Sequence, residues 1–360
     1  MPAKGALKKE HTMSTTPAQT QRSVPHRLLG RSGVRVSSIC LGTMMFGDRT
    51  SEAEAFEIVA ACRDHGINFI DTADVYAQGE SERITGRTIA ADRHRWIVAT
   101  KVANPMGSDP NRRGLSRRWL HQAIDESLQR LGMDHVDIWY LHREDHDTPL
   151  EETIGAMADI VRAGKVRYLG ISNHRAWRMA EIVRLCREAG LPTPAACQPY
   201  YNAFNRMPEV EILPACSHFG IGVASYSPIA RGVLTGKYAP GAAPPEDSRA
   251  GRKDRRILQS EWREESLVMA QEIAAHARSR GMTPVQFAVN WVLNNKAISS
   301  AIAGPRTLAQ MQEYLSAHEQ PFEAQDEALI DRLVVTGHPS TPGYNDPAYP
   351  IEGRQTFTAR

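Results

Sequence analysis

The amino-acid sequence predicts an α/β protein with a closed (β/α)8 TIM barrel, an N-terminal β-hairpin and a long loop after strand seven. Short apolar segments alternate with segments of helical periodicity from about residue 38 onward, and this alternation indicates a parallel sheet with right-handed crossovers. Eight strand–helix units over about 290 residues fit a barrel, which typically takes about 250. A doubly wound open sheet is the alternative, but no G-x-G-x-x-G pattern follows the first strand.

The composition is that of an ordinary globular chain. The 360 residues carry a net charge of +2, and 41% of them are hydrophobic, which is enough for a full core. The near-neutral balance argues against a nucleic-acid or polyanion partner. Five scattered cysteines without a C-x-x-C pair predict reduced, buried thiols, a cytoplasmic location and no metal site. No apolar run is long enough to cross a membrane, so we expect no membrane partner.

Three regions follow from the pattern. Residues 1–25 hold lysines and a Ser/Thr/Gln stretch without an apolar core, so they predict a disordered leader rather than a secretory signal; Met13 is an alternative start. Residues 26–335 form a single barrel domain. Residues 336–360, rich in Pro, Gly and Tyr, predict an irregular C-terminal tail. The oligomeric state stays open, and a homo-oligomer is compatible with the sequence.

The chain begins with a predicted hairpin, 26–29 and 34–36, around the turn at Gly30 to Gly33. The first barrel strand is expected at 38–43. A helix should begin at Ser51, with Glu54 completing a capping box, and should end at Gly66. We expect Phe56, Val59, Ala60 and Arg63 to carry one face of this helix.

The same alternation predicts the other units. Further strands are expected at 68–71, 96–102, 136–141, 168–172, 194–198, 221–225 and 298–302. Helices are expected at 81–90, 117–131, 150–163, 176–189, 208–218 and 308–317. Between strands seven and eight, residues 227–262 form a long loop rich in Pro, Gly and Arg, and two helices follow it, the second opening at Thr283-Pro284. Long loops at an active-site rim are more often functional than not.

Four residues with acid–base chemistry follow consecutive strands. Asp71 ends the second strand, Tyr76 lies in the loop after it, Lys101 ends the third and His142 ends the fourth. Because barrel active sites are built at the carboxyl ends of the strands, these side chains can converge. A phenol normally titrates near pH 10, and a neighbouring ammonium lowers that pKa. The set suits carbonyl reduction, with Tyr76 as the proton donor and His142 orienting the carbonyl oxygen.

Each of these residues has an ordinary explanation when it is taken alone. An Asp after a strand is usually a cap, a His at a strand end is more often structural, and a Lys there often reaches solvent. Their occurrence together at one end of successive strands is what favours a catalytic interpretation. A single residue of this kind would not favour a catalytic interpretation.

These residues and their surroundings resemble the aldo-keto reductase family. The resemblance extends from about residue 26 to residue 334, and within the family it is strongest to the bacterial branch with a long loop after strand seven, which is also similar to potassium-channel β subunits. It implies a (β/α)8 barrel that reduces aldehydes and ketones reversibly with NADPH and without a Rossmann domain. The catalytic tetrad then falls on Asp71, Tyr76, Lys101 and His142. The motifs that carry the resemblance are Leu29-Gly30-Arg31-Ser32-Gly33, Leu41-Gly42-Thr43-Met44-Met45-Phe46-Gly47, Asp71-Thr72-Ala73-Asp74-Val75-Tyr76, Gly164-Lys165-Val166-Arg167, Gly170-Ile171-Ser172-Asn173, Gln198-Pro199-Tyr200-Tyr201-Asn202 and Tyr226-Ser227-Pro228.

The resemblance also implies a cofactor site. Ser172, Asn173 and Gln198 match residues that bind the nicotinamide carboxamide, and Tyr226 matches the aromatic residue that stacks on the ring. Other implied contacts lie beside the ring, around the pyrophosphate and around the adenosine 2′-phosphate, where an arginine favours NADPH over NADH. They are Thr43, Met44 and Asp71 beside the ring and pocket, Ser227, Pro228, Ile229, Arg231, Lys237 and Arg249 around the pyrophosphate, and Gly304, Arg306, Gln310 and Glu313 around the adenosine.

The sequence departs from the family pattern at two positions, and it is compatible with two functions. Tyr314 stands where the family usually has Asn, and Pro305 stands where a small residue is common. The first function is an NADPH-dependent reductase of small-molecule carbonyls. The alternative is a cofactor-sensing binding subunit that resembles channel β subunits. The sequence does not name the carbonyl substrate.

Overall fold

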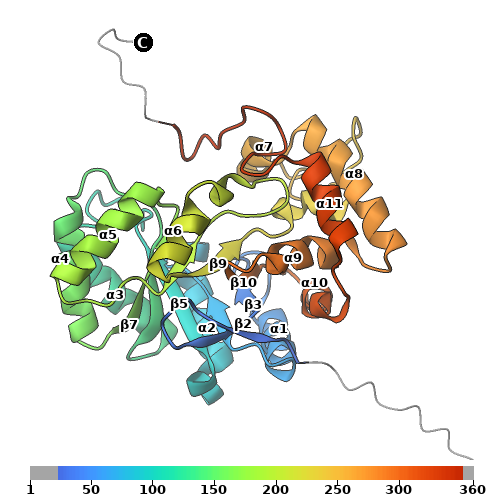
Figure 1. Ribbon diagram of the computed structural model, residues 1–360. Coiled ribbons are helices and arrows are strands. Elements are labelled where there is room, and N and C mark those ends of the chain that lie inside the picture. Colours follow the sequence, from blue (N-terminus) through green and yellow to red (C-terminus); the bar gives the residue numbers. More distant parts are fainter. Residues whose placement is uncertain (1–22, 352–360) are drawn as a thin grey trace, which may run out of the picture.

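Eight short strands close into one parallel barrel in the computed structural model, which describes residues 23–351. The strands are apolar along most of their length because they are buried on both faces, as parallel strands are; all four residues of β3 and all six of β10 are buried. The closed order is β10-β3-β4-β5-β6-β7-β8-β9, so the barrel prediction is confirmed and the open sheet is excluded (Figure 1). The strands are β3 Ile39–Gly42, β4 Phe69–Asp71, β5 Ile97–Val102, β6 Val136–Leu141, β7 Val166–Ser172, β8 Ala196–Gln198, β9 Gly222–Tyr226 and β10 Ile298–Ala303.

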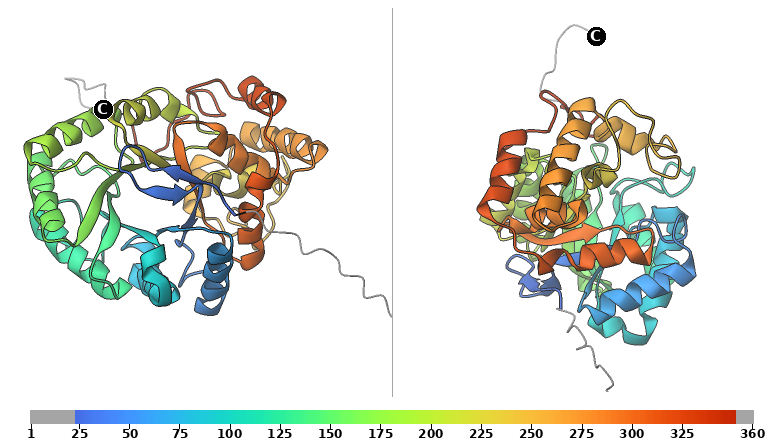
Figure 2. Two further views of the ribbon diagram at one scale, coloured as in Figure 1. Left: turned by 60° about the horizontal axis from the view of Figure 1, so that its bottom comes forward. Right: turned by 90° about the vertical axis from the view of Figure 1, so that its right-hand side faces the viewer.

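Helices surround the barrel as an outer ring (Figure 2). Their ends follow the local sequence signals: Ser116 caps α3 through the backbone N–H of Trp119, and Gly132 ends it in the left-handed region. Thr283 and Gln286 form a reciprocal capping box at the start of α9. The helices are α1 Glu52–Asp64, α2 Glu80–Ile89, α3 Arg117–Leu131, α4 Leu150–Arg162, α5 Ala176–Glu188, α6 Ile212–Phe219, α7 Arg255–Ser260, α8 Glu264–Ser279, α9 Pro284–Asn294, α10 Leu308–Leu315 and α11 Ala324–Leu333.

Helix α1 differs from its prediction in two details. Ser51 accepts a hydrogen bond from the Glu54 backbone, but the Glu54 carboxylate caps another helix, accepting from the Leu308 N–H at 2.5 Å. The capping box is therefore only half formed, because tertiary packing offers the carboxylate another donor. Of the four residues expected on one face, Val59 is buried, but Phe56 is 46% exposed. The buried face consists of Ala55, Ile58, Val59 and Cys62.

The N-terminal hairpin closes the amino end of the barrel. Strand β1, His26–Leu28, pairs antiparallel with β2, Arg35–Ser37, as predicted. Leu29 and Val36 pack against side chains inside the barrel, including Phe69, and the hairpin crosses the barrel end in Figure 2. Gly30 permits this close approach. It has a positive φ of 58°, and a Cβ there would lie 2.3 Å from the carbonyl oxygen of Gly220, just before strand β9. The hairpin leaves the carboxyl end of the barrel uncovered.

The long loop and residues 336–351 of the C-terminal tail lie together over that end. The loop after β9 contains a short 3-10 segment, Ala230–Thr235, and helix α7. The sequence analysis missed α11, which precedes the tail. Asp346 of the tail pairs with Arg256 of α7 at 2.6 and 3.0 Å, and the Tyr344 hydroxyl donates to the Gln259 carbonyl at 2.8 Å. Helix α7 and the tail are neighbours at the top of Figure 1.

Some predictions concern parts that the structure leaves out or treats only in part. Residues 1–22 of the expected leader and residues 352–360 of the expected tail lie outside the described residues. Within residues 23–351, no helix is long and apolar enough to cross a membrane. All five cysteines lie in the described chain, where each is buried and forms no disulfide.

Candidate active site

Asp71, Tyr76 and Lys101 form one hydrogen-bonded group at the carboxyl end of the barrel. The Lys101 ammonium nitrogen lies 2.5 Å from Asp71 Oδ2, 2.6 Å from the Thr72 carbonyl oxygen and 3.3 Å from the Tyr76 hydroxyl. Lys101 is fully buried, and Asp71 is 2% exposed. The three donor positions of the ammonium are therefore all used inside the protein, and one of them points at the phenol.

The strand register places these side chains. Asp71 ends β4 opposite Ala99 of β5, and Lys101 lies two residues further along β5. Residues i and i+2 of a strand face the same side, so Lys101 projects on the same face as Ala99, toward the loop that follows Asp71. The Asp74 side chain shapes that loop by accepting a hydrogen bond from the Val75 N–H at 2.7 Å, and Tyr76 follows directly.

Left-handed backbone is concentrated around this end of the barrel. In the described chain, eight non-glycine residues have a positive φ, and all eight lie in loops that follow barrel strands. Such conformations cost about 1–3 kcal/mol each and cluster at functional sites. They follow four of the barrel strands, β4, β5, β7 and β9. The residues are Ala77, Gln78, Ala103, Asn173, Ser227, Ala230, Arg231 and Lys253.

Burial controls the protonation of the group. It raises the pKa of Tyr76, and Lys101 opposes this shift. The net direction is upward, so our expectation of a lowered phenol pKa was wrong in sign, because burial outweighs the ammonium. Burial lowers the pKa of Lys101, but Asp71 and Tyr76 raise it further than burial lowers it. Lys101 therefore stays charged, and Tyr76 stays protonated, which is the form that a proton donor requires.

His142 lies beside the phenol as a neutral ring. The Tyr76 and His142 rings meet edge to face with centroids 6.1 Å apart. Burial, and then the charges of Lys101 and Arg143, hold the His142 pKa well below its usual value. Its Nδ1 lies 3.0 Å from the Asn104 amide nitrogen, so Asn104 donates there and the Nε2 carries the hydrogen. Sequence reasoning missed Asn104, which occupies the loop after the Lys101 strand and shows no motif.

The residues expected at a nicotinamide form a second connected set. The Gln198 amide donates to Asp71 Oδ1 at 2.8 Å. Asn173 donates to the Ser172 hydroxyl at 3.0 Å and to the His142 carbonyl at 2.8 Å, and it accepts from the Tyr226 hydroxyl at 3.0 Å. The structure thus connects the ends of β7, β8 and β9 to the Asp71 group. It brings together four of the predicted contacts.

A group of basic side chains lies where the phosphates of a dinucleotide were expected. Burial lowers the pKa of Lys237, and Arg306, Arg249 and Arg252 lower it further, with Asp247 as the opposing carboxylate. This excess of positive charge is the donor set that a phosphate needs. A Cβ at Gly232, where φ is 94°, would lie 3.3 Å from the Lys237 ammonium. The residues present therefore fit a dinucleotide phosphate group.

Other expected contacts have different surroundings. Arg231 is paired with the buried Glu261 at 2.9 and 3.1 Å, so its guanidinium serves the loop. The Thr43 hydroxyl lies 2.9 Å from the Ser81 hydroxyl and donates to the Asp71 carbonyl at 3.2 Å, inside the core. Pro228 is buried, Ile229 packs against the core and Asn202 fixes the Ser227 carbonyl at 3.0 Å.

The residues after β10 that were expected to contact the adenosine make few side-chain hydrogen bonds with one another. The Gln310 side chain accepts from the Arg306 N–H at 2.8 Å, and the Arg306 guanidinium donates to the Asp247 carbonyl at 3.3 Å. Gly304 is exposed, and the Glu313 carboxylate makes no hydrogen bond within residues 23–351. Tyr314 is buried, with Arg249 close enough to oppose the rise in its pKa.

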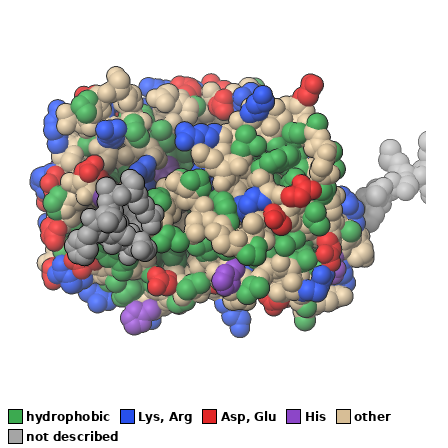
Figure 3. All heavy atoms as spheres, turned by 90° about the horizontal axis from the view of Figure 1, so that it is seen from above, with side chains coloured by type: hydrophobic (Ala, Val, Ile, Leu, Met, Phe, Trp, Pro, Cys, Tyr) green, Lys and Arg blue, Asp and Glu red, His purple; other side chains and the backbone are tan. Residues whose placement is uncertain are grey.

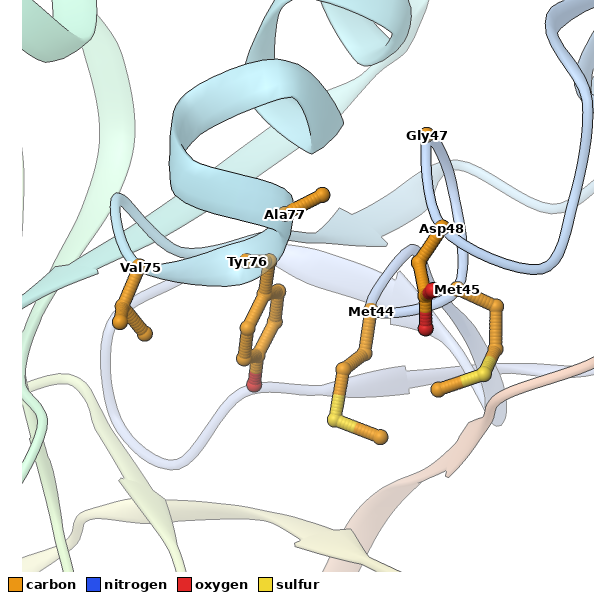
Figure 4. Close-up of a pocket in the computed structure, with 7 residues that line it drawn as sticks. All are labelled: Met44, Met45, Gly47, Asp48, Val75, Tyr76 and Ala77. Carbon is orange, nitrogen blue, oxygen red and sulfur yellow. The ribbon is translucent and has the colours of Figure 1, made fainter. Parts of the chain in front are cut away.

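A cavity of about 490 Å³ opens in front of Tyr76. Figure 4 shows the Tyr76 hydroxyl pointing toward the same space as the side chains of Met44 and Asp48. Met44 and Tyr76 were predicted as site residues, whereas the other lining residues were missed, although each lies within or directly after the motif that ends at Gly47 or the motif that ends at Tyr76. These are Met45, Gly47, Asp48, Val75 and Ala77.

The fold and this site define an oxidoreductase of the barrel class. The sequence profile of the Aldo/keto reductase family matches residues 38–335. The chain is 37% identical over 297 residues to a probable voltage-gated potassium channel subunit beta of Arabidopsis thaliana, covering 81% of this chain and 90% of that protein. It is 34% identical over 317 residues to an uncharacterized oxidoreductase of Bacillus subtilis, with 85% and 94% covered. It is also 33% identical over 324 residues to the L-glyceraldehyde 3-phosphate reductase of Escherichia coli K12, with 87% and 93% covered. This chain belongs to the aldo/keto reductase family, whose members generally use nicotinamide cofactors and act on small-molecule carbonyls.

Proposed function

We propose that this protein is an NADPH-dependent reductase that converts an aldehyde or ketone to an alcohol, reversibly. The observation that carries the proposal is the buried Lys101 ammonium, held by Asp71 at 2.5 Å and directed at the Tyr76 hydroxyl at 3.3 Å. A proton donor activated in this way is needed only where charge develops on a substrate oxygen. The barrel of residues 26–335 is then the catalytic domain, and residues 336–351 of the tail lie over its mouth.

In this proposal the bound nicotinamide supplies the hydride, and the protein supplies the proton. Tyr76 delivers its hydroxyl proton to the oxygen of the carbonyl while the carbon is reduced. Lys101 stabilises the tyrosinate that is left, because the ammonium lies within hydrogen-bond distance of it. Neutral His142 donates from Nε2 to the same substrate oxygen and orients it. Asp71 keeps Lys101 charged and in place.

The cofactor contacts of the proposal are those assigned from the sequence. Ser172, Asn173 and Gln198 would hold the carboxamide, and the Tyr226 ring would stack on the nicotinamide; that ring is already stacked on Tyr200 at a centroid distance of 5.4 Å. Lys237 and Arg249 would bind the pyrophosphate. Arg306 would bind the 2′-phosphate and favour NADPH over NADH, since a planar guanidinium pairs with a phosphate through two hydrogen bonds.

A second function is supported by one comparison. The 37% identity to a probable channel subunit beta favours a cofactor-sensing binding subunit as the alternative. Both functions would retain cofactor binding, so turnover separates them. We expect NADPH to be oxidised in the presence of members of a panel of aldehydes and ketones. The loss of NADPH absorbance measures this oxidation. NADPH binding without turnover of any carbonyl would instead support the binding subunit.

A further inference from the structure

Among the described residues that line the cavity in front of Tyr76, two have polar side chains, namely Tyr76 itself and Asp48. The other lining residues are apolar or glycine, and two of them are the methionines Met44 and Met45. Figure 4 shows the Tyr76 hydroxyl and the Asp48 carboxylate pointing toward the same space. The cavity of about 490 Å³ has the size of a small-molecule site. A substrate whose carbonyl oxygen lies at Tyr76 therefore meets a largely apolar wall with one carboxylate on it.

The loop that carries Asp48 lies between β3 and α1 and has a fixed backbone. The Asp48 N–H donates to the Met45 carbonyl at 3.2 Å, and the Gly47 N–H donates to the Thr50 carbonyl at 3.1 Å. Gly47 has a positive φ of 79°, and a Cβ there would lie 2.8 Å from the Glu80 side chain at the start of α2. The turn hydrogen bonds and the close packing on α2 therefore keep Asp48 at the cavity.

The Asp48 carboxylate is accessible to a ligand. Within residues 23–351, it makes no side-chain hydrogen bond, and its one ionic partner is Arg49, whose Nε lies 3.6 Å from Oδ1. The two side chains are 57% and 51% exposed, and exposed pairs of this kind contribute little. Glu261 and Asp346, by contrast, each accept two hydrogen bonds from an arginine. The acceptor positions of Asp48 are thus open on the side of the cavity.

We propose that Asp48 is a specificity-determining residue of the substrate site, and that the preferred substrates are small aldehydes or ketones whose far end carries hydroxyl groups or a positive charge. The inference rests on the reductase function proposed above and names its substrate class. An ionised carboxylate only accepts hydrogen bonds, and these bonds are stronger than neutral ones because the acceptor is charged. It repels a second anion, so carbonyls with a carboxylate or phosphate are disfavoured. The flexible Met44 and Met45 side chains adapt to the carbon chain between the two polar ends.

Matched pairs of carbonyls test this selectivity. Betaine aldehyde and tert-butylacetaldehyde have the same shape and differ in a positive charge. Glyceraldehyde and propionaldehyde differ in hydroxyl groups, and succinic semialdehyde and butyraldehyde differ in a carboxylate. We expect the wild type to favour the cationic or the hydroxylated member in kcat/KM and to disfavour the carboxylate. The first two pairs distinguish a preference for charge from a preference for hydroxyl groups.

Asp48→Asn removes the charge and keeps the size of the side chain. It should lower kcat/KM for betaine aldehyde relative to its neutral partner, and raise kcat/KM for succinic semialdehyde relative to butyraldehyde. Each ratio should change about 5-fold, which is the effect of a unit charge roughly 4 Å away in water. Asp48→Ala also removes the acceptor, so it should lower the ratio of glyceraldehyde to propionaldehyde more than Asp48→Asn does. These changes should fall mainly on KM, because the lost contact is made before and during the reaction alike.

Asp147→Asn is the matched control, because Asp147 is an exposed aspartate in the loop after β6, at the same end of the barrel, and does not line the cavity. It should leave the ratio within each pair unchanged. Ratios that also stay unchanged in both Asp48 variants, or a wild type that favours succinic semialdehyde over butyraldehyde, would overturn the proposal. Failure of the reductase function itself would show instead as no turnover of any of these carbonyls.

Discussion

The Lys101 ammonium nitrogen lies 2.5 Å from Asp71 Oδ2 with both side chains buried. Such a pair is costly to desolvate, and a hydrophobic pair of similar volume is often as stable. Its position explains why it is present: the same ammonium lies 3.3 Å from the Tyr76 hydroxyl and 4.8 Å from the centre of its ring. The ion pair thus holds a positive charge against a phenol at the carboxyl end of the barrel.

Tyr76→Phe is expected to abolish most carbonyl reduction while leaving NADPH binding nearly unchanged. The substitution removes only the hydroxyl, and the Lys101–Asp71 pair stays intact. General acid catalysis typically contributes about 10²–10⁴-fold, so kcat should fall by that order. Steady-state kinetics and a cofactor titration measure the two effects. A variant with more than half of the wild-type turnover would remove Tyr76 from the mechanism.

Lys101→Met is expected to lose both activity and stability, in contrast to Tyr76→Phe. It should lose activity because the developing tyrosinate loses its counter-charge, and it leaves the Asp71 carboxylate buried without its counter-ion, with only the Gln198 amide still donating to it. Breaking a buried pair in this way typically costs about 3–5 kcal/mol of stability. Chemical denaturation should therefore show a large loss for Lys101→Met and a small one for Tyr76→Phe.

Arg306→Ala should weaken NADPH binding much more than NADH binding. Only NADPH carries the 2′-phosphate, and a hydrogen bond to a charged group contributes roughly 1.5–3 kcal/mol, or about 10–100-fold in Kd. Titration of both cofactors by quenching of intrinsic fluorescence measures the difference. Arg255→Ala, which removes an exposed charge from helix α7 in the loop after β9, is the control. Equal weakening of NADPH and NADH would assign the discrimination to another residue.

Cofactor binding is expected to order the long loop after β9. Residues 239–247 are largely exposed, so few apolar contacts offset the entropy of ordering them, whereas α7 is fixed to the tail by the Arg256–Asp346 pair. We therefore expect NADPH to slow hydrogen exchange most in 239–253 and less in α7. Reopening of this segment would then contribute to product release. Exchange rates that are the same with and without NADPH would contradict the closure.

Asp74 should make stability depend on pH. Burial raises its pKa to about 8, with Glu82 adding to the shift, and its Oδ2 has no hydrogen-bond partner in the described chain. The folded protein then keeps the proton up to about pH 8, while the unfolded chain loses it near pH 3.9. Stability therefore falls as pH rises through this window, by at most about 1.4 kcal/mol per pH unit.

Asp74→Asn lacks this ionisation and can still accept the hydrogen bond from the Val75 N–H. Its melting temperature relative to the wild type should therefore rise between about pH 4 and pH 8 and then level off. Thermal unfolding of both proteins across that range measures the effect. A difference between the two proteins that stays constant with pH would show that Asp74 does not retain its proton.

Much of the fold was determined locally and could be predicted. The helix over Arg117–Leu131 and the strand over Val136–Leu141 have the predicted bounds, because periodicity, Ser116 and Gly132 are signals within the segment itself. The convergence of Asp71, Tyr76, Lys101 and His142 was also predictable, since parallel strands leave their carboxyl ends at one edge. Whether the side chains would touch was not.

Tertiary structure decided the features that depend on partners distant in sequence. Glu54 caps α10 rather than its own helix, and Arg231, expected at the pyrophosphate, is paired with Glu261. The direction of the Tyr76 pKa shift also followed from burial, which no local pattern reports. The sequence by itself determined which residues reach the open end of the barrel, because chain order and strand period set that placement. Only the packed structure decided which of their charges are compensated, because compensation requires atoms from other strands and loops within a few ångströms.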